Sequence, residues 1–257
     1  MDCRKISEAL SRMIRPQSHP LGLKFFKAGE TLPEGAVRPA KYGIRISLCQ
    51  WTTMARRWGR VLGATAADIN CAGCLAALGF KALKDPGHLA AYLMDMGYFS
   101  DAEGARRAVA EMGLIPPGKI AAVTLFPLDL APVSPDVIVV YGTPAQMARL
   151  AAGYVYHGGE LIASKTTGFG LSCLSAVKPH FTGKPALVHP GRGERMLAGT
   201  DEWEMFFTFP ADRAESLLDG LEKTQEKGTR YPVQSYLLYE PPVIDAMRRL
   251  EEKLSDL

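Results

Sequence analysis

Apolar residues recur along this chain at two spacings, one typical of helices and the other of strands. Apolar positions three and four residues apart predict amphipathic helices at 6–14, 51–62, 75–78, 88–96, 101–112, 144–156, 211–224 and 242–254. Runs of β-branched and aromatic residues bounded by turn residues predict strands at 21–27, 44–48, 120–125, 137–141, 161–163, 186–189 and 203–209. Because helices and strands mix throughout, we expect an α/β or α+β fold, with a mixed sheet covered by helices.

Two stretches of the chain resemble each other weakly. Residues 54–56 (MAR) match 147–149 (MAR), and 74–78 (CLAAL) resemble 173–177 (CLSAV). A duplication of this kind would pack two similar units about a pseudo-twofold axis and bring Cys74 near Cys173. We therefore expect a single domain over residues 1–257 whose internal units span 21–115 and 120–225.

The composition is that of an ordinary soluble protein. Hydrophobic residues make up 47% of the 257 positions and charged residues 22%. The net charge of +3, with no run of five or more Lys or Arg, argues against nucleic acid as a partner. No apolar run approaches the roughly 20 residues that span a bilayer, and the N-terminal segment lacks the apolar region of a signal peptide. We expect a cytoplasmic protein that does not bind membranes.

The cysteines give the strongest chemical signal. Three of the five lie within residues 46–80, as Cys49, Cys71 and Cys74, and Cys173 lies far downstream. Clustered cysteines in a reducing compartment favour a metal site or catalysis over disulfides. Four thiolates are the usual ligands of [4Fe–4S] and [2Fe–2S] clusters, and helix starts, where each cysteine is predicted to lie, stabilise the thiolate. We therefore expect these four residues to hold one [4Fe–4S] cluster.

Other interpretations of the same cysteines stay open. Zinc also takes four thiolates, although its sites are usually built from two close pairs, whereas only Cys71 and Cys74 form such a pair here. Buried free cysteines are common core residues, and this pair could also form a redox dithiol. Cys3, in the N-terminal segment, is given no role.

A loop rich in glycine and arginine follows the strand predicted at 186–189. Gly191, Arg192, Gly193 and Arg195 combine backbone N–H groups with guanidinium groups, which suit a carboxylate or a phosphate. The same segment is typical of a tight turn in which Arg195 forms a salt bridge. It matches neither the Walker phosphate loop nor a dinucleotide fingerprint. An anion-binding site is therefore the alternative to a cysteine centre.

The remaining polar candidates carry less weight. The five histidines show no paired metal spacing, and His157 and His189 are the two we would expect to line a cleft. The acidic residues Asp201, Glu202 and Glu204 are expected in a solvated turn.

On these features the chain resembles a known family. The Cys49 helix with its Cys71 and Cys74 segment, the Cys173 segment, and the 190–195 loop before an acidic turn and a Phe-rich strand are similar to the archaeal conserved region (ArCR) family of unknown function. The resemblance covers residues 22–221. It implies an anaerobic cytosolic setting, in which oxygen-sensitive clusters survive, and it brings no established activity. Some relatives have a cysteine near the position of His189, where this chain departs from them.

These observations predict an iron–sulfur redox protein of anaerobic metabolism that transfers electrons or reduces a bound small molecule. Its expected partner is a redox protein or a small acidic ligand. The alternatives are a metal-free module that binds small anions through residues 191–195, and an interaction protein stabilised by zinc.

Overall fold

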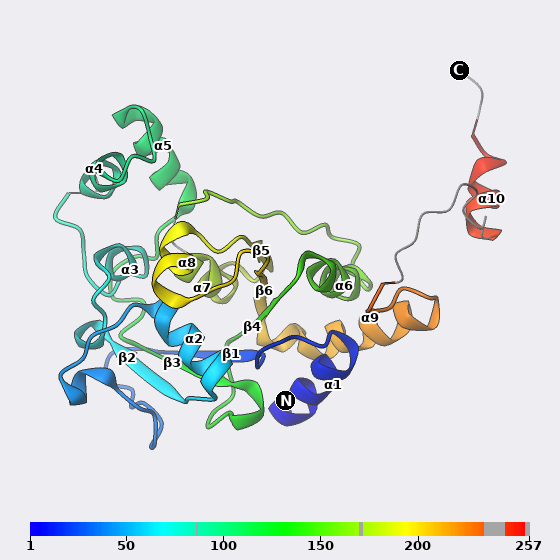
Figure 1. Ribbon diagram of the computed structural model, residues 1–257, viewed down its shortest axis with the longest axis horizontal. Helices are drawn as coiled ribbons and strands as arrows, with labels where there is room; N and C mark the ends of the chain where they lie inside the picture. Colours follow the sequence, from blue (N-terminus) through cyan, green and yellow to red (C-terminus); the bar gives the residue numbers. More distant parts are fainter. Residues whose placement is uncertain (86, 170–171, 234–244, 255–257) are drawn as a thin grey trace.

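A six-stranded sheet organises the computed structural model, which describes residues 1–85, 87–169, 172–233 and 245–254 (Figure 1). The strand order is β2-β3-β1-β4-β6-β5, and neighbouring strands are antiparallel. The strands are β1 (Leu21–Phe26), β2 (Leu62–Thr65), β3 (Ala122–Pro127), β4 (Val137–Gly142), β5 (Ala186–Val188) and β6 (Met205–Pro210). The predicted α/β or α+β architecture, with helices over a sheet, is confirmed.

Strand β4 illustrates why helices cover both faces of the sheet. Its side chains alternate between two cores: Val139 and Tyr141 belong to one, and Ile138 and Val140 to the other. Every residue of β4 is buried. A continuous apolar run is typical of a strand that is buried on both faces.

The first face carries the elements that surround the candidate site. Trp51 of α2, Leu75 of α3 and Leu174 of α7 share a core with Leu23 and Val139 of the sheet. Helices α4 and α5 pack against each other beyond α3, at the upper left of Figure 1. The bounds are α2 (Leu48–Trp58), α3 (Ala72–Ala77), α4 (Gly87–Asp95), α5 (Ala102–Met112), α7 (Ser172–Thr182) and α8 (Arg192–Ala198).

The second face is covered by α1 (Cys3–Met13), α6 (Pro144–Val155) and α9 (Ala214–Glu226). Helices α6 and α9 approach closely because glycines meet at their contact. A Cβ atom placed on Gly220 would lie 2.1 Å from the carbonyl oxygen of Gly153. The remaining elements are η1 (Pro39–Tyr42), η2 (Ala66–Asp68), η3 (Leu128–Leu130), η4 (Ala211–Arg213) and α10 (Asp245–Glu251).

Four sequence-based assignments differ from the structure. Residues 44–48 form no strand; Ile46 makes only an isolated bridge to Ile69. Helix α2 ends at Trp58, because Gly59 adopts a left-handed conformation that caps it, and the chain beyond becomes β2. Residues 161–163 lie outside the sheet. The segment at 191–195 is not a loop but the start of α8. Of the helix predicted at 242–254, residues 242–244 lie outside the described part of the chain.

The two halves of the sheet have similar strand orders. From one edge the order is β2-β3-β1, and from the other it is β5-β6-β4, with β1 and β4 meeting at the centre. However, α2 and α6, which contain the two matching MAR segments, pack on opposite faces. The pseudo-twofold relation stays a prediction.

Among the described residues, no helix has both the length and the apolar character needed to cross a membrane.

Candidate functional site

The four cysteines of interest line one cavity of ≈ 230 Å³ on the first face of the sheet. Cys49 lies in the first turn of α2, Cys71 is the N-cap of α3, Cys74 lies inside α3, and Cys173 is the second residue of α7. We call this cavity the thiol pocket. The structure therefore brings together residues that are up to 124 positions apart in the sequence, from Cys49 to Cys173.

The prediction of an iron–sulfur redox protein is nevertheless wrong. Within the described ranges, no group of three or more His, Cys, Asp and Glu side chains is placed to hold a metal ion. The same finding removes the interpretation as a zinc-stabilised protein. The paired spacing has another explanation: the Cys71 Sγ accepts the backbone N–H of Cys74 at 3.4 Å. Cys71 thus caps α3, and Cys74, 2% exposed, packs in the core.

Three of the thiols are held in their protonated form. Burial raises the pKa of Cys49 well above its ordinary value, and the nearby Cys173 and Glu194 add to this. The Cys74 side chain, through a hydrogen bond, and burial raise the pKa of Cys173 well above its ordinary value. Burial also raises the pKa of Cys71, although its backbone hydrogen bonds oppose the shift. Burial outweighs the stabilisation expected at helix starts, so these thiols act as small apolar groups.

Large apolar side chains from α4 and α8 form the rim of the thiol pocket. Tyr92 of α4 and Met96, the residue after its last, are 47% and 43% exposed, and Met196 and Leu197 of α8 are 66% and 60% exposed. Deeper in the wall, the rings of Tyr98 and Phe169 lie 5.1 Å apart. Apolar side chains that gather at the mouth of a concave site are typical of a surface that a ligand or partner covers.

Glu194 of α8 is the buried carboxylate of this pocket. The side chain is 3% exposed, and its Oε1 accepts hydrogen bonds from the Tyr141 hydroxyl at 2.7 Å and the Thr200 hydroxyl at 3.3 Å. Its Oε2 has no hydrogen-bond partner among the described residues. Burial raises the pKa of Glu194, against the opposing effects of the Tyr141, Ser172 and Thr200 hydroxyls and of the charge of Arg56. An unpartnered buried carboxylate oxygen is costly and calls for an explanation.

A fully buried ion pair lies behind Glu194. Arg56 of α2 donates to Glu204 Oε1 at 2.5 Å and to Glu204 Oε2 at 2.9 Å. Its guanidinium carbon lies 4.2 Å from the centre of the Tyr141 ring. The prediction of a solvated turn is therefore wrong for Glu204, which is only 3% exposed. Arg57 adds a second hydrogen bond to Glu204 Oε2, at 3.0 Å.

The residues predicted to bind an anion do not form one group, because Arg195 is engaged by backbone carbonyls whereas Arg192 is exposed. Arg195 donates to the backbone carbonyls of Pro190, Asp201 and Glu204, so it holds the chain on either side of α8 together. Arg192 is exposed and, with Gly193, lines the thiol pocket, while Gly191 is the N-cap of α8. Of the two histidines, His157 pairs with Asp219 at the surface, and His189 lines a separate small cavity of ≈ 40 Å³.

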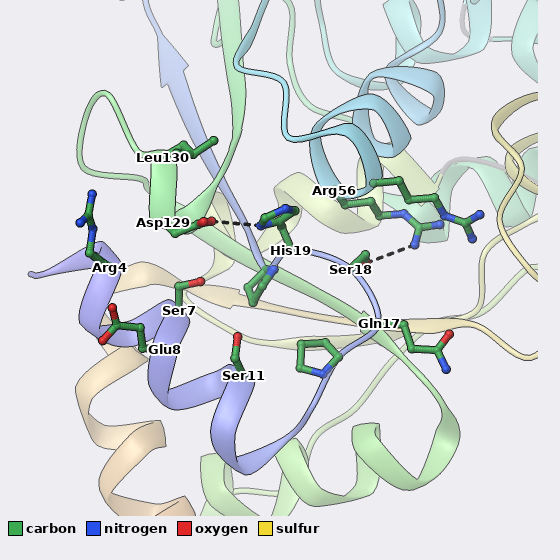
Figure 2. Close-up of a pocket in the computed structure, with 13 residues that line it drawn as sticks. Arg4, Ser7, Glu8, Ser11, Gln17, Ser18, His19, Arg56, Asp129 and Leu130 are labelled. Carbon is green, nitrogen blue, oxygen red and sulfur yellow. Dashed lines mark hydrogen bonds and ion pairs between the residues drawn. The ribbon is translucent and has the colours of Figure 1, made fainter.

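A second and larger hollow, of ≈ 790 Å³, lies between α1, the end of α2 and η3 (Figure 2). His19 points towards Asp129, with its Nδ1 3.1 Å from Asp129 Oδ1, and Arg56 donates to the Ser18 hydroxyl at 3.4 Å (Figure 2). Most of its charged side chains already have a partner of opposite charge. Arg56 thus connects this open polar hollow with the buried ion pair behind the thiol pocket.

The functional residues that sequence reasoning missed are Glu194, Tyr141 and Arg56. Glu194 was hidden in a segment interpreted as a loop, and Tyr141 in an apolar strand. Arg56 lies in the last turn of α2, where a basic residue is common at the surface, so nothing in the sequence indicated its burial. Only the packing of α2, α8 and β4 shows that these three side chains meet.

The family model described as Uncharacterised ArCR (DUF169) matches residues 9–220 of the chain. This match confirms the family resemblance seen in the sequence. Neither a curated protein nor a solved structure matches the chain. The anaerobic setting and the expected partner, a redox protein or a small acidic ligand, stay predictions.

Proposed function

We propose that this chain, which belongs to the Uncharacterised ArCR family, binds a compact organic molecule with a largely apolar body in the thiol pocket. The observation that carries the proposal is the pocket itself. It is a concave site on the first face of the sheet, walled by side chains of α2, α3, α4, α7 and α8 and bordered by exposed Tyr92, Met96, Met196 and Leu197.

The physical reason is the burial of apolar surface. Each square ångström of apolar surface removed from water contributes about 25 cal/mol, and four large side chains at the rim still face solvent. A ligand that covers them gains this energy without a large rearrangement of the protein. Methionine and cysteine side chains are polarizable, and methionine is also flexible, so the wall can adapt to the shape of its ligand.

The size of the pocket limits the ligand. Pockets for drug-sized molecules have volumes of roughly 300–1,000 Å³, whereas this cavity measures ≈ 230 Å³. The occupant is therefore a single ring system or a short branched chain.

A cytoplasmic location is part of the proposal, supported by five cysteines that are all free, since a reducing compartment keeps thiols unpaired.

Methionine-methyl NMR tests the proposal directly. With ¹³C-methyl methionine incorporated, indole at about 5 mM, enough to populate a millimolar site, should shift the signals of Met96 and Met196. The signals of Met13 and Met147, which lie in the core on the other face, should stay in place. Unmoved Met96 and Met196 signals, with the protein folded, would overturn the proposal.

A matched pair of surface variants adds a control. Leu197→Ser removes an apolar side chain from the rim of the pocket, and Leu161→Ser removes one that is 85% exposed and outside it. The first should weaken indole binding several-fold, because less apolar surface is covered. The second should leave it unchanged. Equal binding by both variants would count against the rim as part of the site.

A further inference from the structure

We infer that the ligand of the thiol pocket carries a cationic nitrogen, which pairs with Glu194. This inference rests on the proposed function and specifies the class of ligand: a small amine or amidinium with an apolar body. It starts from Glu194 Oε2, a buried carboxylate oxygen without a hydrogen-bond partner among the described residues.

Within the described part of the chain, the hydrogen bonds of Glu194 leave one oxygen of the buried carboxylate without a donor. The hydroxyls of Tyr141 and Thr200 both donate to Oε1. A ligand N–H group that reached Oε2 would satisfy the remaining oxygen. Buried polar groups in folded proteins almost always have such a partner, and a charged donor makes the strongest bond to a carboxylate.

The charges around Glu194 also favour a cationic ligand. The charge of Arg56 lowers the pKa of Glu194, but its guanidinium is already engaged by both oxygens of Glu204. In the part of the chain that the structure describes, no Lys, Arg or His side chain forms an ion pair with Glu194. Buried charges are normally paired, so the missing partner of this carboxylate is a cation supplied by the ligand.

The pocket wall suits a cation with an apolar body. Tyr92, Tyr98 and Phe169 all line the pocket, and the faces of aromatic rings attract cations. The thiols of Cys49 and Cys173 are held protonated, and Glu194 contributes to this. They therefore add no charge that would compete with Glu194 for the ligand.

Two other ligand types are alternatives that experiment separates. Because burial raises the pKa of Glu194, a protonated carboxyl group could donate to a ligand carbonyl. An anionic ligand could instead reach the exposed Arg192 at the rim. The three types have nearly isosteric representatives: benzamidinium for the cation, benzamide for the neutral carbonyl compound and benzoate for the anion.

Titration of the Met96 and Met196 methyl signals with these three compounds tests the inference. Benzamidinium should bind about tenfold or more tightly than benzamide, as expected for a hydrogen bond between charged groups in a buried site, and benzoate should bind most weakly. Equal binding of benzamidinium and benzamide, or tighter binding of benzoate, would overturn the inference but leave the proposed function standing. If none of the three compounds nor indole moved these signals, the proposed function itself would fail.

The Glu194→Gln variant isolates the carboxylate. It keeps the acceptor for Tyr141 and should abolish the preference for benzamidinium, while indole binding is retained. Glu222→Gln, at an exposed position outside the pocket, is the matched control and should keep the preference. If Glu194→Gln fails to fold, a second experiment uses the unmodified protein. Infrared difference spectra with and without benzamidinium then report whether its carboxyl groups are protonated. Benzamidinium should then reduce the signal of a protonated carboxyl group or increase that of a carboxylate; an increase in the protonated signal would contradict the inference.

Discussion

The Tyr141 hydroxyl lies 2.7 Å from Glu194 Oε1 and donates a hydrogen bond to it. This bond joins the central strand β4 to the short helix α8, which also forms part of the rim of the thiol pocket. Burial, followed by the charge of Glu194, raises the pKa of Tyr141 well above its ordinary value. The phenol therefore stays protonated and acts as a permanent donor. The position of Glu194 in the pocket is thus fixed by the sheet itself.

Replacing Tyr141 with Phe should destabilise the protein by about 1.5–3 kcal/mol, the range for a hydrogen bond to a charged group. The variant should also raise the pKa of Glu194 further, because its carboxylate loses a donor. Urea denaturation measures the first effect. Tyr156→Phe, at a position that is 46% exposed, should change stability little. A Tyr141→Phe variant as stable as the parent would show that the bond contributes nothing.

Glu204→Gln should cost about 3–5 kcal/mol, since it leaves the buried guanidinium of Arg56 without its counter-charge. Glu202→Gln is a close control, because Glu202 lies two residues away and is exposed. The two variants differ only in which of two neighbouring carboxylates becomes an amide. Denaturation of both in urea gives the comparison, and a similar loss in both would contradict the role assigned to the ion pair.

The same ion pair predicts how stability depends on pH. Burial alone would raise the pKa of Glu204, but the hydrogen bonds from Arg56 and from the Asp201 backbone outweigh it and lower the pKa from its ordinary value of 4.5. A carboxyl group with a lowered folded-state pKa contributes its full stability above 4.5 and loses it as pH falls towards the folded-state value. The unmodified protein should therefore lose more stability on acidification than Glu204→Gln does.

Much of the fold could be predicted from the sequence, because periodicity reports burial directly. Strands β3, β4 and β6 are long apolar runs and were recognised. Strand β2 has only four residues, and Leu62 continues the apolar spacing of the preceding helix, so the sequence predicts no more than a connector with room for a short strand there. The left-handed conformation of Gly59 ends that helix, and the spacing of apolar residues does not reveal this conformation.

The candidate site was predictable only in part, for a different reason. Cys74 and Cys173 could be expected to meet because of the weak duplication, and the four cysteines because together they make up a usual set of thiolate ligands. Their chemistry could not be derived from spacing, because cysteine spacing does not distinguish a ligand set from a helix cap with core neighbours. The roles of Glu194 and Arg56 depend on contacts with Tyr141 and Glu204, which lie 53 and 148 positions away in the chain, and no local sequence pattern predicts such contacts.

The thiols give a prediction that concerns reactivity. Because burial raises the pKa of Cys49 and of Cys71, both should react with iodoacetamide more slowly in the folded protein than in concentrated urea at neutral pH. The rate should increase as pH rises through and above the ordinary thiol range. Mass spectrometry of the alkylated peptides follows each residue separately. Fast labelling of Cys71 in the folded protein would mean that its thiolate is stabilised instead.

The last prediction concerns the contact between α6 and α9. Gly220→Ala should destabilise the protein by about 1–3 kcal/mol or more, because the added Cβ would lie 2.1 Å from the carbonyl oxygen of Gly153 and the helices would have to separate. Gly193→Ala makes the same chemical change in α8, where nothing lies within 4 Å of the added atom. It should be neutral or stabilising by up to roughly 1 kcal/mol, since alanine favours helices over glycine. The midpoint of thermal denaturation, Tm, should therefore fall for Gly220→Ala and should rise or stay unchanged for Gly193→Ala. Equal destabilisation by both would show that close helix packing is not what requires Gly220.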